Sequence, residues 1–433
     1  MGMTLTEKVM ARNSGRESVS PGEIVEAAVN VAMLHDVGTP GVQEPLKALG
    51  VSTIPSALEV VIIQDHFVPA PTVKAAENIK LTQEYGERMG IENYYGVGRG
   101  GICHQVMPEK GHVRPGEIII GTDSHTTTYG AFGALGTGVG VTDMAIVLGL
   151  GKLWLRVPGT VRVEITGVLG PAVSAKDVAL MLLKEFGEDG LLYDSVELVG
   201  PAIDSLSMDS RMCLCDMAVE MGAKFAVVPP DEKTRRYLQG RTRKPFSEFH
   251  SDPDARFERS FQFDVSNLKP LVAIPHSPSN VEELDRIGSV SIDQAFLVSC
   301  TNGRLEDLRI AAGILKGKKV HPRVRLIVAP ASRDVYLQAL DEGLIRTFVE
   351  AEGTVTPPTC GACVGGHLGL LASGEVCISS SNRNFRGRMG SKDAAVYLAS
   401  PATVAASALA GKIVPACRAK RRGAGRDPRE VLS

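Results

Sequence analysis

The chain has 433 residues, of which 44% are hydrophobic and 22% are charged, and this composition excludes a disordered or fibrous protein. Its 47 basic and 49 acidic residues give a net charge of −2, so no nucleic-acid-binding surface is indicated. Eight cysteines are too few for a disulfide framework in a chain of this length. The N-terminus lacks a signal peptide and no apolar run could span a bilayer. We therefore expect a cytoplasmic protein with reduced cysteines and no membrane partner.

Short runs of aliphatic and β-branched residues recur along the chain. Because they are continuous rather than alternating, they predict strands covered on both faces, as in parallel α/β sheets. The predicted strands are 59–64, 117–120, 161–165, 295–298, 324–328 and 376–378. The predicted helices are 23–34, 73–89, 175–185, 306–315, 332–342 and 402–410.

Polar residues that can do chemistry follow several of these strands. Asp65 and His66 follow the first, Asp123 and His125 lie just after the second, and Cys300 follows a later one. In open α/β sheets, ligands bind at the carboxyl ends of the strands. This recurrence predicts a reactive site at those ends.

Two proline-containing segments suggest where domains end. Val157-Pro158-Gly159 precedes a new predicted strand. A charged segment at 241–270 is broken by Pro245 and Pro253, and Pro275-His276-Ser277-Pro278 follows it. We place the domain boundaries near residues 158 and 285, which gives domains 1–158, 159–285 and 286–433. The basic segment at 418–429 is interpreted as a solvated terminus.

Three cysteines form the most informative pattern. Cys360 and Cys363 lie in a loop rich in proline and glycine, and Cys300 lies 60 residues upstream. They could fill the core, form a redox pair, bind zinc with His367, or hold an iron–sulfur cluster. The cluster fits best, because the loop glycines let the backbone approach it closely. Three thiolates would leave one iron free to act as a Lewis acid.

The histidines and arginines suggest proton transfer and carboxylate binding. An Asp beside a His can orient the imidazole and raise its basicity, as expected for Asp65 and His66. A hydrolase triad made of Asp123, Ser124 and His125 is excluded, since neighbours on a strand point to opposite faces and no nucleophile elbow is present. Three arginines lie within residues 383–388 and suit bidentate carboxylate binding.

Five ordered motifs resemble those of the aconitase superfamily, nearest to the large subunits of 3-isopropylmalate dehydratase and homoaconitase. The motifs are Gly101-Ile102-Cys103-His104-Gln105-Val106, Gly121-Thr122-Asp123-Ser124-His125-Thr126, Ser299-Cys300-Thr301-Asn302, Cys360-Gly361-Ala362-Cys363 and Ser381-Asn382-Arg383-Asn384-Phe385. The resemblance covers nearly the whole chain. It implies three doubly wound α/β domains around a central iron–sulfur site, and one [4Fe-4S] cluster per subunit held by Cys300, Cys360 and Cys363.

The resemblance also implies roles for individual residues. The implied catalytic residues are Asp65, His66, His104, Asp123, His125 and Glu220, and the implied substrate-binding residues are Ser124, Asn382, Arg383 and Arg388. His66 would protonate the departing hydroxyl group with Asp65 as its partner, while Asp123 would support His104. Two positions depart from the family. It often has Asn where this chain has Asp216, and an early family position with a substrate-contacting Gln reads here as Thr39-Pro40-Gly41.

The resemblance further implies a partner and a reaction. Single-chain aconitases resemble this chain plus a fourth, swivelling domain that carries a catalytic Ser and Arg. We expect a separate small subunit to supply that domain, in a heterodimer or heterotetramer. The favoured reaction is the isomerisation of 2-isopropylmalate to 3-isopropylmalate in leucine synthesis. The alternatives are homoaconitase, a dimethylmalate, methylmalate or maleate-type hydratase, an RNA-binding regulator active without its cluster, and a zinc-stabilised structural subunit.

Overall fold

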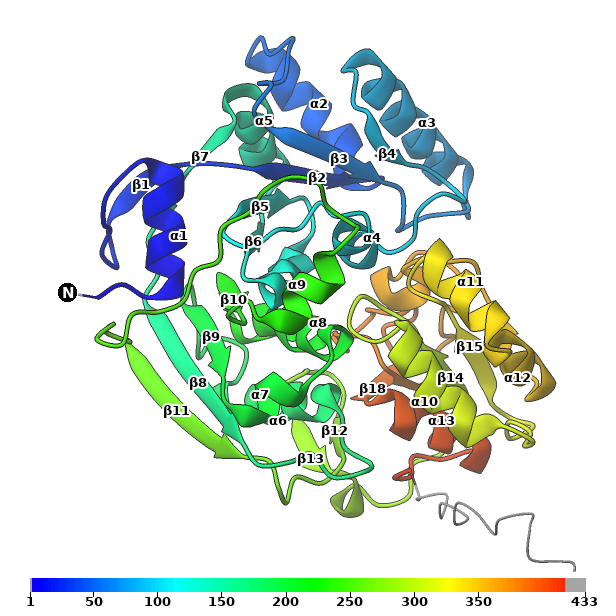
Figure 1. Ribbon diagram of the computed structural model, residues 1–433. Coiled ribbons are helices and arrows are strands. Elements are labelled where there is room, and N and C mark those ends of the chain that lie inside the picture. The colour runs from blue at the N-terminus through cyan, green and yellow to red at the C-terminus, as the bar shows by residue number, and fades with distance from the viewer. Residues whose placement is uncertain (1, 417–433) are drawn as a thin grey trace, which may run out of the picture.

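The computed structural model describes residues 2–416, so the basic segment at 418–429 lies outside the described residues. The first sheet is parallel and has the strand order β4-β3-β2-β5-β6. Its strands are β2 (Val31–His35), β3 (Glu59–Ile63), β4 (Asn93–Tyr95), β5 (Ile118–Gly121) and β6 (Leu135–Gly138). The helices of this unit are α1 (Leu5–Ser14), α2 (Gly38–Ala48), α3 (Val73–Arg88), α4 (Cys103–Glu109) and α5 (Val141–Leu150). In Figure 1 it occupies the top of the view, with α2, α3 and α5 on its outer side.

A second parallel sheet has the strand order β10-β9-β8-β11. Its strands are β8 (Thr160–Thr166), β9 (Ser195–Val199), β10 (Phe225–Val227) and β11 (Arg259–Asp264). The accompanying helices are α6 (Ala175–Phe186), α7 (Pro201–Ser205), α8 (Met208–Met217) and α9 (Glu232–Leu238). A short antiparallel pair, β1 (Ile24–Ala28) with β7 (Lys152–Arg156), lies beside the first sheet.

The third sheet is mixed and has the order β13-β12-β18-β17-β14-β15-β16. Its strands are β12 (Leu271–Ala273), β13 (Val281–Glu283), β14 (Gln294–Leu297), β15 (Arg325–Val328), β16 (Thr354–Val355), β17 (Val376–Ser379) and β18 (Ala395–Ala399). The helices are α10 (Leu305–Leu315), α11 (Arg333–Asp341), α12 (Leu344–Glu350) and α13 (Pro401–Ala410). Strands β14 to β18 run parallel, whereas β12 and β13 are antiparallel additions at one edge.

The predicted α/β fold with parallel sheets is confirmed, and so are all six predicted strands and five of the six predicted helices. The helix predicted at 23–34 is wrong, because this segment forms β1 and β2. Val25 and Ala27 are buried while Glu26 between them is exposed, which is a strand pattern, and β2 is buried throughout as a central strand. Asn30 separates the two strands, and its side-chain oxygen accepts a hydrogen bond from the N–H of Ile118 at 2.7 Å.

The predicted domain boundaries at 158 and 285 stay predictions. The first boundary lies between β7 and β8, and thus between the first two sheets. Strands β12 and β13 precede residue 285 and pair within the third sheet.

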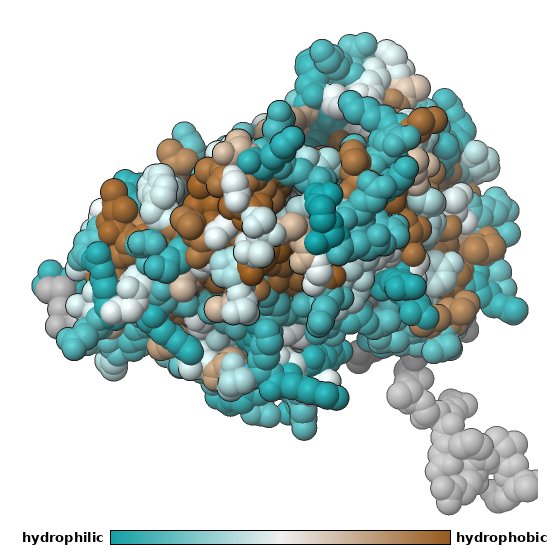
Figure 2. Space-filling model, turned by 90° about the horizontal axis from the view of Figure 1, so that it is seen from above, coloured by the Kyte–Doolittle hydropathy of each residue, from teal (hydrophilic) through white to brown (hydrophobic). Residues whose placement is uncertain are grey.

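The surface is mostly hydrophilic on the face seen in Figure 2, with apolar side chains gathered in patches. Exposed large apolar residues include Ile24, Trp154 and Leu192. Among residues 2–416, no helix combines the length and hydrophobicity that a membrane crossing requires.

Candidate active site

One small cavity brings together residues that are far apart in the sequence. It lies between loops of the first and third sheets, and nine of the predicted site residues line it. These nine are His66, His104, Asp123, His125, Cys300, Cys360, Cys363, Asn382 and Arg388. A larger cleft of about 620 Å³ adjoins the cavity, and Ser124 and Arg383 line it. The strand ends predicted from the sequence therefore converge on one site.

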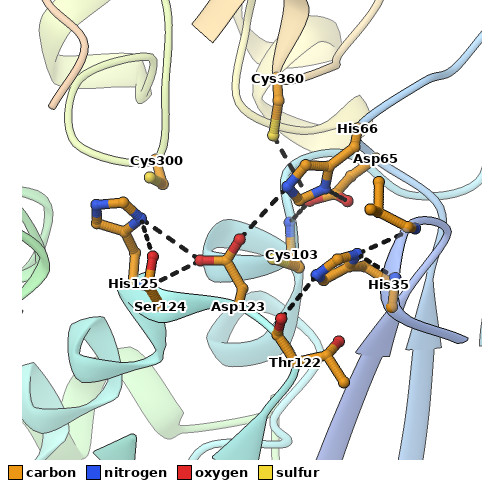
Figure 3. A network of polar contacts seen from close by, with 12 residues as sticks. His35, Asp65, His66, Cys103, Thr122, Asp123, Ser124, His125, Cys300 and Cys360 are labelled. Atoms are coloured by element: carbon orange, nitrogen blue, oxygen red, sulfur yellow. Dashed lines mark hydrogen bonds and ion pairs between the residues drawn. The ribbon is translucent and has the colours of Figure 1, made fainter. Parts of the chain in front are cut away.

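Asp65 and His66 follow β3 directly and are both buried. His66 Nδ1 donates to Asp65 Oδ1 at 2.5 Å, and His66 Nε2 lies 3.3 Å from Asp123 Oδ2 (Figure 3). The second oxygen of Asp65 accepts the N–H of Cys103 at 2.8 Å. Both ring nitrogens of His66 thus face carboxylates, which orients the imidazole for proton transfer.

Asp36 and His35 support this pair, although no sequence motif singles them out. Asp36 accepts the N–H groups of Asp65, His66 and Phe67 at 2.9–3.0 Å, which fixes the turn after β3. The ring of His35 stacks on that of His66 with centroids 4.3 Å apart. The Asp36 carboxylate follows β2, the strand that neighbours β3, and the sheet order cannot be read from the sequence.

Asp123 organises a second part of the site. It is the N-cap of the 3-10 helix η1 (Ser124–Phe132), and its Oδ1 accepts the N–H of His125 at 2.7 Å. The same oxygen accepts a hydrogen bond from His104 Nε2 at 2.9 Å. The hydroxyl oxygen of Tyr129 lies 3.1 Å from His104 Nδ1. This turn packs against β6 because Gly138 has no side chain: a Cβ there would lie 2.4 Å from the Asp123 carbonyl oxygen.

His125, Glu220 and Arg383 form a chain of contacts that joins all three units. Glu220 lies in the 3-10 helix η2 (Ala218–Met221) of the second unit. His125 Nε2 donates to Glu220 Oε1 at 2.7 Å, and Arg383 Nε donates to the two Glu220 oxygens at 2.7 and 3.0 Å. Ser124 Oγ lies 3.4 Å from His125 Nδ1. The arginine is thereby held at the edge of the cleft.

The electrostatics favour protonated imidazoles beside ionised carboxylates. Burial alone raises the pKa of Asp65, but the charge and hydrogen bond of His66 lower it to about 2. Burial lowers the pKa of His66, whereas Asp65 and Asp123 raise it well above its usual value. Burial likewise lowers the pKa of His125, but the charge of Asp216 and hydrogen bonds with Asp123 and Glu220 raise it to about 10.

The three predicted ligand cysteines lie together and are not paired in disulfides. Cys360 precedes the 3-10 helix η4 (Gly361–Val364), which contains Cys363. Asn382 joins two of them, since its Nδ2 donates to Cys300 Sγ at 3.1 Å and its Oδ1 lies 3.4 Å from Cys363 Sγ. Ser299, beside Cys300, has a φ of 99°, a strained conformation for a residue with a side chain.

These residues fit an iron–sulfur cluster. Burial raises the pKa of the Cys300 and Cys360 thiols well above the usual value, so a metal group is what would hold them as thiolates. His367 is not placed to complete the zinc site considered above, because its Nε2 is engaged with the carbonyl of Pro69 at 2.6 Å and it does not line the cavity. Cys377 is buried in β17, also outside the cavity lining, whereas Cys103 does line it.

Lys176 is a fully buried cation that the sequence reasoning missed. Its Nζ donates to the carbonyls of Ser380 and Ser381 at 2.9 and 2.7 Å and lies 3.4 Å from Thr301 Oγ1. It therefore ties the segment before Asn382 to the segment after Cys300. A lysine on the apolar face of the predicted helix at 175–185 was the available signal.

Asp216, which departs from the family pattern, is fully buried close to the cysteines. Its Oδ2 accepts Thr128 Oγ1 at 2.9 Å, and its Oδ1 lies 3.4 Å from Asn382 Nδ2. Its carboxylate thus adds a negative charge beside the residue that contacts two of the thiols.

Arg388 reaches both the cavity and the adjoining cleft. Its Nε is buried and has no hydrogen-bond partner within residues 2–416. An unsatisfied buried guanidinium nitrogen is costly unless an anion binds it. Arg386, which lies between the two predicted binding arginines, is exposed and lines neither space.

The fold and site define an α/β protein with proton-transfer groups beside three thiols that can hold a metal group. The chain matches the model of the aconitase family (aconitate hydratase) over residues 7–289 and 282–411. It is 52% identical over 413 residues to the 3-isopropylmalate dehydratase large subunit 1 of Methanopyrus kandleri, covering 95% of this chain and 98% of that protein. The chain therefore belongs to the aconitase family, as the motifs predicted.

A second relative gives a consistent result. The 3-isopropylmalate dehydratase large subunit of Halothermothrix orenii is 48% identical over 413 residues, covering 95% of this chain and 98% of the relative. The crystal structure of the holo-form of aconitase X from Thermococcus kodakaraensis aligns with a TM-score of 0.48 and 13% identity, covering 83% of this chain and 84% of that one.

Proposed function

We propose that this chain is the large, catalytic subunit of a hydro-lyase that converts 2-isopropylmalate to 3-isopropylmalate by dehydration and rehydration, in leucine biosynthesis. The observation that carries the proposal is the convergence of three thiols and the Asp65–His66–Asp123 network on one cavity. The extended identity with large subunits of 3-isopropylmalate dehydratases supports the substrate.

We propose that Cys300, Cys360 and Cys363 hold one [4Fe-4S] cluster per subunit. Held by these three thiolates, such a cluster would supply Lewis-acid chemistry toward the hydroxyl group of the substrate. Asn382, which contacts two of the thiols, is placed to donate to the cluster sulfurs. These free thiols also support a reducing, cytoplasmic location.

The chain's own residues would then do the proton transfer and the binding. His66, held protonated between Asp65 and Asp123, donates a proton from Nε2 to the departing hydroxyl group. Arg388 and Arg383 bind the substrate carboxylates from the cleft side, Arg383 being fixed by Glu220. Asp123 keeps the His104 ring in place, and Glu220 does the same for His125. Ser124 and Asn382 complete the binding residues that we propose.

We infer that a separate small subunit completes the site, in a heterodimer or heterotetramer. The names of the two relatives support this, because both are large subunits. The cleft has a volume of about 620 Å³, which is more than a small hydroxy acid fills. It therefore leaves room for groups from a partner. The small subunit would carry the swivelling domain with its catalytic Ser and Arg.

The test is to assay the reconstituted complex with 2-isopropylmalate, homocitrate and citraconate. We expect the highest kcat/KM with 2-isopropylmalate. A preference for homocitrate would assign the chain to homoaconitase, and a preference for citraconate would assign it to a methylmalate-type or maleate-type hydratase. Either result would overturn the proposed substrate.

A further inference from the structure

A second cavity, of about 390 Å³, lies apart from the site described above. It lies between the segment that follows β3, the glycine-rich loop after β4, and α11 of the third unit. It shares no lining residue with the thiol-lined cavity or with the adjoining cleft. Its volume is within the range of small-molecule sites.

The walls of this cavity are largely apolar. Val68, Val97, Leu337, Val355 and two neighbouring prolines face it. Val97 and Leu337 keep 52% and 45% of their surface exposed, so apolar surface at the mouth is left in contact with water. A compact aliphatic group bound here would remove that surface from water.

The polar groups of the cavity are few. The Gln64 side chain is engaged, since its Nε2 donates to the carbonyl of Ile79 at 3.0 Å. Within residues 2–416, the guanidinium of the exposed Arg333 has no hydrogen-bond or ion-pair partner in the protein, and neither has the hydroxyl of the half-buried Tyr336. The N–H groups of Gly98 and Gly100 in the facing loop likewise donate to no protein acceptor in this part of the chain. All of these groups can donate to an anion. One guanidinium matches the single charge and planar shape of a carboxylate.

We propose that this cavity binds a small aliphatic monocarboxylate, with its carboxylate on Arg333 and its hydrocarbon part against Leu337 and Val97. The site is an effector site rather than a second catalytic site, because no predicted catalytic residue lines it.

The cavity is connected to the active site through the chain. Gln64 and Val68, which line it, flank Asp65 and His66 in the sequence. Pro357 and Pro358 line it as well and lie just before Cys360. An occupant therefore contacts the segments that carry both the proposed acid and one proposed cluster ligand.

The test uses 4-methylpentanoate, which has no hydroxyl group with which to chelate iron. Its binding to the full cluster-loaded chain is measured by calorimetry, with the uncharged 4-methylpentanamide as a comparison. We expect one site per chain, and an affinity at least about tenfold weaker for the amide and for Arg333→Gln, since each loses a charge-assisted hydrogen bond. Arg346→Gln, an exposed arginine on α12, is the matched control and should bind as wild type.

A second variant keeps the test independent of the arginine. Leu337→Glu places a negative charge at the mouth and should also abolish binding, whereas the exposed Leu340→Glu on the same helix should not. Binding should persist in saturating 2-isopropylmalate. The proposal is overturned by absent binding to wild type, by equal binding to Arg333→Gln, or by displacement with 2-isopropylmalate. The variant readouts do not depend on the proposed reaction, so the two proposals can fail separately.

Discussion

The main-chain carbonyl of Asp65 accepts a hydrogen bond from the N–H of Cys360 at 3.0 Å. The Thr359 hydroxyl donates to the same carbonyl at 2.9 Å. The loop that carries the proposed cluster ligand is therefore attached to the residue that orients His66. This attachment fixes the proposed acid relative to the proposed metal group, which proton donation to a bound hydroxyl group requires.

Replacing His66 should slow turnover strongly while the cluster is retained. His66→Asn removes the ring between Asp65 and Asp123 and is expected to lower kcat by about 100-fold or more, the usual contribution of general acid catalysis. His250→Asn, an exposed histidine, should leave kcat unchanged. Steady-state kinetics of the reconstituted complex, with iron analysis of each sample, check this. A His66→Asn enzyme with near-normal kcat would remove His66 from the mechanism.

The four cysteines that line the cavity should differ in whether the cluster depends on them. Cys300→Ser, Cys360→Ser and Cys363→Ser are expected to lose the cluster. Cys103→Ser is expected to keep it, although Cys103 lines the same cavity, because the proposed cluster has three cysteine ligands. Iron and sulfide per chain, measured after anaerobic reconstitution, give the answer. Loss of iron in Cys103→Ser would make Cys103 a fourth ligand. That result would contradict the proposal that one iron has no cysteine ligand.

The sequence identified the cysteines and the polar strand ends because each lies within a short local motif. It could not identify Asp36 or Lys176, whose roles depend on which strand neighbours which and on contacts between domains. The helix predicted at 23–34 is wrong because a short, largely apolar segment fits a strand and a helix about equally well. The ion pair of Glu220 with Arg383 joins two units and was likewise invisible, although both residues had been singled out.

Lys176 should contribute to both stability and cluster binding. Lys176→Met leaves the carbonyls of Ser380 and Ser381 without their donor, which we expect to cost about 3 kcal/mol of stability. It should also speed cluster loss, because the segment leading to Asn382 is released. Lys184→Met, which is half exposed on the same helix, is the control. Melting temperature and the rate of iron release to a chelator are measured, and a variant matching Lys184→Met in both would refute this role.

A buried ion cluster around Glu59 should make stability depend on acid pH. Burial raises the pKa of Glu59, but hydrogen bonds from His112 and Lys244 and the charge of Arg114 lower it to about 2, below its ordinary 4.5. Its stabilisation is therefore complete above about pH 4.5 and is lost as the pH falls towards 2. Glu59→Gln should cost about 2 kcal/mol at pH 7, and its deficit relative to wild type should shrink below pH 4.5.

Thermal melting of both proteins from pH 7 downwards tests this prediction, with the exposed Glu232→Gln as control. A deficit that stays constant down to the acid limit would mean that the charge of Glu59 is not what stabilises the fold.

The most direct measurement is Mössbauer spectroscopy of the reconstituted, iron-57-labelled complex before and after addition of 2-isopropylmalate. With three cysteine ligands, about a quarter of the iron signal should change on addition, since one iron of four is left to bind the hydroxy acid. A spectrum that does not change, with four equivalent irons, would contradict the account.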